Sequence, residues 1–188
     1  MIAGIILGVI VLIVVIAFFY VFSTQRKLVS LDEMAKNALG QIAVQLQSRW
    51  DAVGALVKLT HQYSDHEYKT LTDTIAQRRT IDVKNPTASA INQDMNSFGG
   101  VVGRLMAVSE QYPALKADGI FRETMNSMKG YEENARVSRM VYNDATTKIN
   151  RMIRQWPSSF VAGMLHFTLR DYIEASQEAQ SGYPDLGK

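Results

Sequence analysis

The distribution of hydrophobic residues divides the chain into two parts. From Ile2 to Phe22 the sequence IAGIILGVIVLIVVIAFFYVF contains no charged side chain. At 1.5 Å rise per residue, a helix over this run reaches about 31 Å, matching the hydrocarbon core of a bilayer at about 30 Å. A signal peptide would need a basic start, a shorter apolar core and a small-residue cleavage site, and this run lacks them. The pattern therefore predicts a retained transmembrane anchor over residues 1–22.

The remainder of the chain has helical periodicity and no strand pattern. From Leu28 to Tyr63 apolar residues recur at three- and four-residue steps, which predicts a first helix. This helix is a candidate to be continuous with the transmembrane anchor. Further helices are predicted over residues 64–83, 86–111 and 118–155, with Asn85 capping the third and Pro86 at its first position.

These elements predict an all-α fold, with the N-terminal transmembrane helix followed by an up-and-down antiparallel four-helix bundle. The bundle is expected over residues 23–178 and a C-terminal tail over residues 179–188.

Charge patterning indicates the orientation and excludes one class of partner. Arg26 and Lys27 follow the apolar run, and no charged side chain precedes it. The positive-inside rule then predicts an N-terminus outside and residues 23–188 in the cytoplasm. The 20 Lys and Arg are nearly balanced by 18 Asp and Glu with the signs interspersed, which argues against a nucleic-acid-binding surface. We expect a lipid bilayer as a partner and no nucleic acid.

The segment HQYSDHE, residues 61–67, is the strongest candidate for metal chemistry. A metallopeptidase helix needs H-E-x-x-H, but Thr70 occupies the position of the second histidine. No glutamate has a histidine three residues later, as a di-iron bundle requires, and the chain has no cysteine. The S-x-x-E spacing of Ser64 and Glu67 predicts a capping box instead. We therefore expect no catalytic residue, no metal and no cofactor, and a protein that is not an enzyme.

Two rows of polar residues follow the predicted helices. The first has four-residue steps and consists of Asn37, Gln41, Gln45 and Arg49. The second has seven-residue steps, with Arg139 alongside, and consists of Arg136, Asn143 and Asn150. Opposite the second row an apolar stripe is predicted, formed by Val137, Val141, Ala145, Ile149 and Ile153. The rows are either solvated faces or contacts with other helices, within the bundle or between protomers. We hypothesise the second, in which the amides must be fully hydrogen-bonded.

The segment SSFVAGMLHFTLRDYI, after Pro157, is apolar but too short to span a bilayer. Two interpretations are open: it folds back over one end of the bundle, or it docks against a neighbouring subunit or the lipid interface. The residues proposed for docking are Trp156, Phe160, Met164 and Phe167, near Arg151 and Arg154.

Three stretches together resemble the signatures of the LemA family. They are QIAVQLQSRWDAVGALVKLTHQYSDHE, YPALKADGIF and EENARVSRMVYNDATTKINRMIRQWPSSFVAGMLHF. The matching residues, expected to be structural rather than catalytic, are Gln45, Arg49, His66, Glu67, Glu133, Asn134, Tyr142, Asn143, Asn150 and Pro157. Ser48, Gly54 and Ser138 depart from the pattern. The resemblance implies a bacterial membrane-anchored helical bundle without an established activity, some of whose relatives are linked to internal membrane compartments.

The sequence thus predicts a non-catalytic scaffold that self-assembles as a homo-oligomer at the bacterial inner membrane. Anchoring confines copies to two dimensions, so modest lateral contacts suffice for assembly. The alternative is a tethered adaptor or regulator that binds a soluble partner or a membrane protease.

Overall fold

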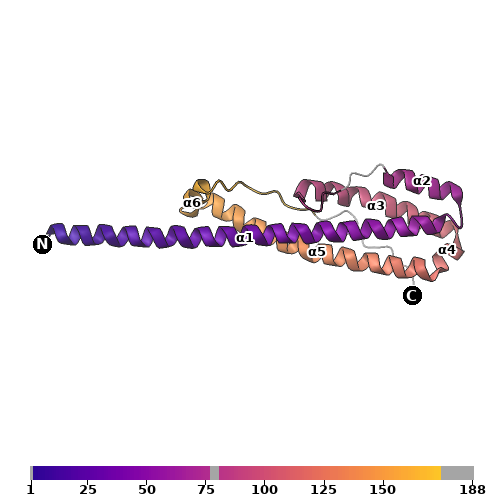
Figure 1. The fold of residues 1–188 in the computed structure, drawn as a ribbon, viewed down its shortest axis with the longest axis horizontal. Helices are drawn as coiled ribbons and strands as arrows, with labels where there is room; N and C mark the ends of the chain where they lie inside the picture. Colours follow the sequence, from indigo (N-terminus) through magenta and orange to yellow (C-terminus); the bar gives the residue numbers. More distant parts are fainter. Residues whose placement is uncertain (1, 77–80, 175–188) are drawn as a thin grey trace.

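The computed structural model describes residues 2–76 and 81–174, and within them every regular element is a helix (Figure 1). The elements are α1 (Ile2–Thr60), α2 (Asp65–Ala76), α3 (Ala88–Gln111), α4 (Pro113–Ala117), α5 (Gly119–Arg154) and α6 (Ser158–Met164). The all-α class predicted from the sequence is confirmed. The predicted tail, residues 179–188, lies outside the described residues.

Helix α1 joins the apolar run to the rest of the molecule without a break. Its N-terminal part projects beyond all the other helices (Figure 1), and its apolar side chains there are exposed. In the described residues this is the one helix long and apolar enough to cross a membrane. From Leu28 onward the same helix supplies core residues, because one apolar face recurs every three or four positions.

Helices α1 and α5 form the antiparallel axis of the helical body, and α2 and α3 pack on α1. The core consists of two clusters of buried residues. The one nearer the apolar run includes Ala35, Ile42, Leu46, Ile91, Tyr142, Ala145 and Ile149. The one farther from it includes Trp50, Val53, Leu56, Leu71, Phe98, Leu105, Leu115, Phe121 and Met125.

Two predicted boundaries differ in the structure. Helix α2 is described over Asp65–Ala76, and residues 81–87 are not helical, so α2 does not reach residue 83. Helix α3 is capped by Thr87, whose Oγ1 accepts from the Ala90 amide at 3.2 Å. Asn85 is not the cap, because α3 begins only at Ala88. The Asn85 backbone amide belongs to the preceding turn, where it donates to the Asp82 carboxylate at 3.3 Å.

Asp118 fixes the start of α5. Its Oδ1 accepts hydrogen bonds from the amides of Ile120 at 2.8 Å and Phe121 at 3.2 Å. Replacing such a cap with alanine leaves these amides without a protein acceptor and costs about 1 kcal/mol. We therefore expect Asp118→Ala to lower the free energy of unfolding by about 1 kcal/mol in denaturant titration followed by circular dichroism. An unchanged transition would show that the cap does not stabilise α5.

Candidate functional site

The segment HQYSDHE forms the turn between α1 and α2. Ser64 Oγ accepts from the Glu67 amide at 3.3 Å, which is one half of the predicted capping box. The other half does not form, because the Ser64 amide donates to the Thr60 carbonyl oxygen at 2.9 Å. His61 Nε2 lies 3.2 Å from Asp65 Oδ1 at the surface. In the described part of the chain no three histidine, cysteine or acidic residues come together as metal ligands.

A cluster of buried charges lies between α1 and α5. Arg49, on α1, is 0% exposed and donates from Nη1 to the Glu132 carboxylate on α5. The other Glu132 oxygen lies 3.7 Å from Nη2 of Arg139, which is also buried. One carboxylate therefore interacts with two guanidinium groups that have little contact with water. Among the described residues, Nε and Nη2 of Arg49 and Oε1 of Gln45 are buried without a hydrogen-bond partner.

Helix α3 completes this cluster with an aromatic and an acidic group. The Arg49 guanidinium lies 3.7 Å from the centroid of the Phe98 ring, a cation–π contact. Trp50 packs edge-on against Phe98 with 5.0 Å between the ring centroids. Its indole nitrogen donates to both carboxylate oxygens of Asp94, at 2.9 and 3.0 Å. The cluster thus links α1, α3 and α5 at one level of the body.

Burial has an electrostatic consequence for Arg139. It lowers the pKa of the Arg139 guanidinium, while the Glu132 carboxylate raises this pKa and the Arg49 charge lowers it. Buried ion pairs contribute little net stability compared with apolar residues, but removing one partner leaves an uncompensated charge. The cluster therefore favours one register of α1 against α5, the one that brings Arg49 to Glu132.

A second polar site holds the non-helical segment after α6, residues 166–174, which we call the strap. Nδ2 of Asn150 donates to the Arg170 carbonyl oxygen, and Oδ1 accepts from the Arg170 amide, both at 2.9 Å. Asn143 binds Ile173 in the same way, at 2.8 and 3.0 Å. Each amide side chain thus satisfies both the N–H and the C=O of one strap residue.

Two further side chains extend this pattern. On α3, Asn92 donates to the Tyr172 carbonyl oxygen at 3.2 Å and accepts from the Glu174 amide at 3.0 Å. On α5, the Tyr142 hydroxyl donates to the Asp171 carbonyl oxygen at 2.9 Å. The strap therefore crosses from α5 to α3.

The strap also contacts α1 and the core. The Arg170 guanidinium forms an ion pair with Asp32, and Ile173 is buried in the core cluster nearer the apolar run. The hypothesis had assigned the Asn143 and Asn150 amides to other helices or protomers. Their partner is instead this non-helical segment of the same chain.

The remaining residues of the two rows have different surroundings. Asn37 and Gln41 line a groove of about 370 Å³ between α1 and α5, and Gln41 Oε1 accepts from Ser138 at 3.3 Å. Arg136 is exposed and donates to Glu133, and this hydrogen bond lowers the pKa of Glu133. A row with four-residue steps drifts about 40° per step around a helix, so it passes from this groove to the buried Arg49.

The predicted apolar stripe on α5 is only partly buried. Ala145 and Ile149 are 0% exposed, whereas Val137 is 49% and Val141 is 41% exposed. The predicted apolar stripe therefore enters the core at Ala145 and Ile149 and stays at the surface at Val137 and Val141.

The residues near the predicted membrane boundary, and three of the four residues predicted to dock, lie at the surface. Arg26 and Lys27 are exposed, and the Arg26 guanidinium lies 5.7 Å from the Phe22 ring centroid. Of the residues predicted to dock, Phe167 instead packs partly buried against the core. The other three, Trp156, Phe160 and Met164, are exposed.

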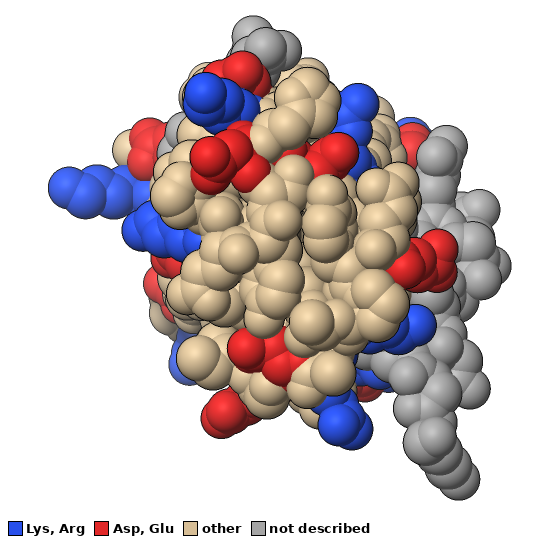
Figure 2. Space-filling view, turned by 90° about the vertical axis from the view of Figure 1, so that its right-hand side faces the viewer, with Lys and Arg blue, Asp and Glu red and all other residues tan. Residues whose placement is uncertain are grey.

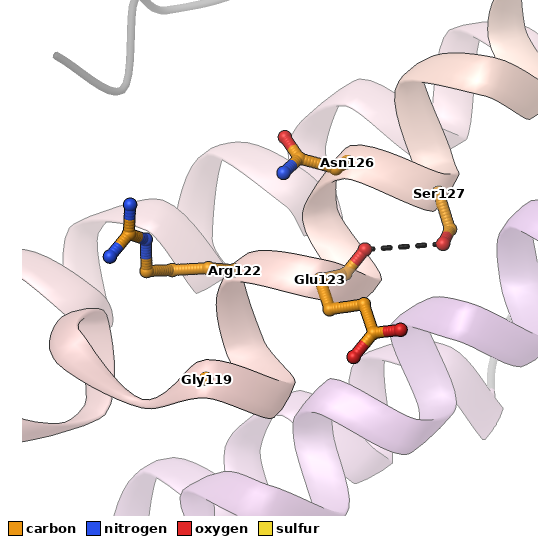
Figure 3. Close-up of a pocket in the computed structure, with 5 residues that line it drawn as sticks. All are labelled: Gly119, Arg122, Glu123, Asn126 and Ser127. Carbon is orange, nitrogen blue, oxygen red and sulfur yellow. Dashed lines mark hydrogen bonds between the residues drawn. The ribbon is translucent and has the colours of Figure 1, made fainter. Parts of the chain in front are cut away.

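An open depression of about 610 Å³ lies along the first turns of α5, lined by Gly119, Arg122, Glu123, Asn126 and Ser127 (Figure 3). All five residues come from one helix, and Ser127 Oγ donates to the Glu123 backbone oxygen at 3.1 Å. The side chains of Arg122 and Glu123 point away from one another (Figure 3). The depression therefore shows no convergent set of catalytic groups.

In the described residues the structure is thus that of an all-α protein whose one long apolar N-terminal helix is consistent with a single-pass membrane anchor. The chain belongs to the LemA family, whose sequence model matches residues 38–186, so the family resemblance is confirmed.

Relatives with curated names are magnetosome proteins. The chain is 27% identical to MamQ 1 and to MamQ 2 of Paramagnetospirillum magneticum over 172 residues, covering 78% of this chain and 63% of each relative. It is 26% identical to MamQ of Magnetospirillum gryphiswaldense over 170 residues, covering 77% and 62%. The chain therefore spans less than two thirds of these relatives' length. The family and these names indicate a structural or membrane protein.

Proposed function

We propose that this protein is a non-catalytic scaffold that α1 anchors in a bacterial inner membrane and that assembles laterally with copies of itself. The observation that carries the proposal is the unbroken course of α1, from an exposed apolar segment into the core of the body. A helix without a hinge transmits the orientation of its membrane segment to the body. The basic residues Arg26 and Lys27 favour an N-terminus outside and the body in the cytoplasm.

We further propose that the body is an up-and-down four-helix bundle formed by α1, α2, α3 and α5. These helices alternate in direction along the chain (Figure 1), and α1 packs against each of the others. Along the part of α5 nearer the apolar run, the strap rather than a helix packs against α5.

The surface proposed for assembly is the groove between α1 and α5. Two of its lining residues are apolar and exposed, Met34 at 42% and Val141 at 41%. On the same two helices Val44, Val137 and Met140 are also exposed, at 48%, 49% and 60%. Asn37 and Gln41 lie in the groove itself and can exchange hydrogen bonds with a partner. Apolar residues around a few polar ones are typical of protein–protein contacts. Since both helices run along the length of the body, copies standing side by side in one membrane would meet along this face.

We expect Val141→Lys to reduce the mass of the detergent-extracted particle from an oligomer to a monomer, measured by size exclusion with light scattering. Assembly would remove water from the introduced ammonium group, whereas in the exposed monomer the charge stays hydrated and costs little. The matched control is Ile120→Lys, which introduces the same charge at a 64%-exposed position at the start of α5. A wild-type monomer, or equal effects of the two substitutions, would contradict assembly through the groove.

A tethered adaptor is the second candidate, and one surface favours it. The end of the body farthest from the N-terminus of α1 carries mainly uncharged side chains at its centre, with charged ones mostly around it (Figure 2). There a soluble partner could be held at a fixed distance from the bilayer. In this case the extracted protein is a monomer, and Ile120→Lys rather than Val141→Lys abolishes partner binding.

The relatives support a role at a membrane. MamQ proteins carry the name of the magnetosome. We propose that this chain organises a membrane surface rather than transforms a substrate.

A further inference from the structure

Helix α6 has one face packed on the body and one face without a protein partner in the described structure. Val161 and Ala162 are buried, at 2% and 0% exposed. Exposed apolar residues are Phe160 at 67% and Met164 at 60%, which lie four positions apart and so share one side of α6. Trp156, at 85% exposed, lies in the turn immediately before the helix. We call these three exposed residues the α6 apolar face.

The register of α1 against α5 shows at which level along α1 this face lies. Gln41 contacts Ser138 and Arg49 contacts Glu132, so positions on α5 fall as positions on α1 rise. Extending this antiparallel register toward the apolar run brings Arg154, the last residue of α5, to about the level of Arg26. The start of α6 therefore lies where the apolar run ends.

The arrangement of the helices agrees with this register. Helix α6 packs against α1, and it lies at the end of the body from which the apolar part of α1 projects (Figure 1). After α6 the chain turns back along the body, where the strap reaches Asp32 of α1 through Arg170.

The charges around this level favour an anionic surface. The exposed basic residues here are Arg26, Lys27, Arg151 and Arg154. The acidic residues near them are Glu33 and Asp171, which are exposed, and Asp32, which already pairs with Lys36 at 2.9 Å and with Arg170. Aromatic side chains beside a cationic rim are the combination that binds at the boundary between acyl chains and anionic headgroups.

We propose that the α6 apolar face inserts into the interfacial layer of the membrane that α1 crosses. The body then has two attachments to one bilayer, and the second fixes the depth and the tilt of the body relative to the membrane. Because depth and tilt are fixed, the groove between α1 and α5 lies at the same height above the bilayer in every copy. The inference rests on the proposed anchoring by α1 but does not require self-assembly.

The two tryptophans of the chain make the test direct, since Trp50 is 3% and Trp156 is 85% exposed. The intact protein is reconstituted in phosphatidylcholine and phosphatidylglycerol vesicles, with bromine atoms on the acyl chains either close to the headgroup or close to the chain end. The emission of Trp156 is the difference between the spectra of the wild type and of Trp156→Phe. We expect bromine close to the headgroup to quench this emission and aqueous iodide to leave it unchanged. In the vesicles, Trp156 is expected to emit at shorter wavelength than an indole that is exposed to buffer.

A matched control places the reporter at the opposite end of the body. In the variant Trp156→Phe/Ile120→Trp the new indole is at the start of α5, far from the apolar run, and we expect iodide but not brominated lipid to quench it. Emission from Trp156 that iodide quenches and brominated lipid does not would overturn the inference. Shielding from both quenchers would also overturn it and would indicate a protein partner on the α6 apolar face.

Flotation of the same vesicles after an alkaline wash reports the α1 anchor separately. Protein that floats with the vesicles but shows no lipid quenching contradicts the α6 attachment alone. Protein that the wash releases contradicts the anchor on which the proposed function also rests.

Discussion

Glu132→Gln is expected to lower the free energy of unfolding by about 3 kcal/mol, which is the largest effect of any single substitution considered for this protein. The carboxylate of Glu132 is the acceptor for the fully buried Arg49 guanidinium and lies 3.7 Å from that of Arg139. Glutamine has nearly the same shape but no charge, so two buried cations remain close together without compensation. Denaturant titration of the detergent-solubilised protein, followed by circular dichroism, measures the loss.

The neighbouring residue supplies the control for this experiment. Glu133 occupies the next position of α5 but pairs at the surface with Arg136, at 2.6 Å. Water and salt screen such a pair, so Glu133→Gln is expected to leave the unfolding transition unchanged. If the two variants unfold alike, the buried cluster does not have the structural role assigned to it.

Asn143→Leu is expected to lower the free energy of unfolding by about 2–3 kcal/mol, because it leaves the N–H and C=O of Ile173 without their protein partners. Leucine fills a similar volume, so the lost hydrogen bonds at 2.8 and 3.0 Å dominate the effect. The damage should be local at first. Hydrogen exchange of the strap amides is expected to accelerate well before exchange in the middle of α5 changes.

Asn134→Leu provides the comparison, since it makes the same change at an exposed position of the same helix. It is expected to alter neither the unfolding transition nor exchange in the strap. Unchanged strap protection in Asn143→Leu would show that the asparagine side chains do not hold this segment.

The helices could be predicted from the sequence because their signals are local. The apolar spacing of α1 and α5 follows directly from 3.6 residues per turn, and the charge-free run identifies the anchor. The boundary at Thr87 could not be fixed in this way. Asn85-Pro86 has the composition of a helix start, but Thr87 is also a good capping residue, and in the structure Asn85 belongs to the turn made by Asp82.

The polar sites illustrate what the sequence does not determine. The amide and guanidinium rows were visible as spacing, but their partners depend on contacts between distant segments. Glu132 and Glu133 are indistinguishable in the sequence, although only Glu132 faces Arg49. The strap has no periodic pattern, so residue spacing alone does not reveal that Asn143 and Asn150 bind its backbone rather than a helix. Asn92 was missed for the same reason.

The central claim is that one uninterrupted helix passes from the bilayer into the core of the body. Because the chain has no cysteine, spin labels can be attached to cysteines that replace the exposed residues Leu12 and Lys36. Double electron–electron resonance is then recorded on the protein in vesicles, diluted with unlabelled copies. A continuous helix predicts a narrow distribution centred at about 36 Å, since each residue adds 1.5 Å. A broad distribution, or one centred at a much shorter distance, would show a hinge at the membrane boundary and contradict the account.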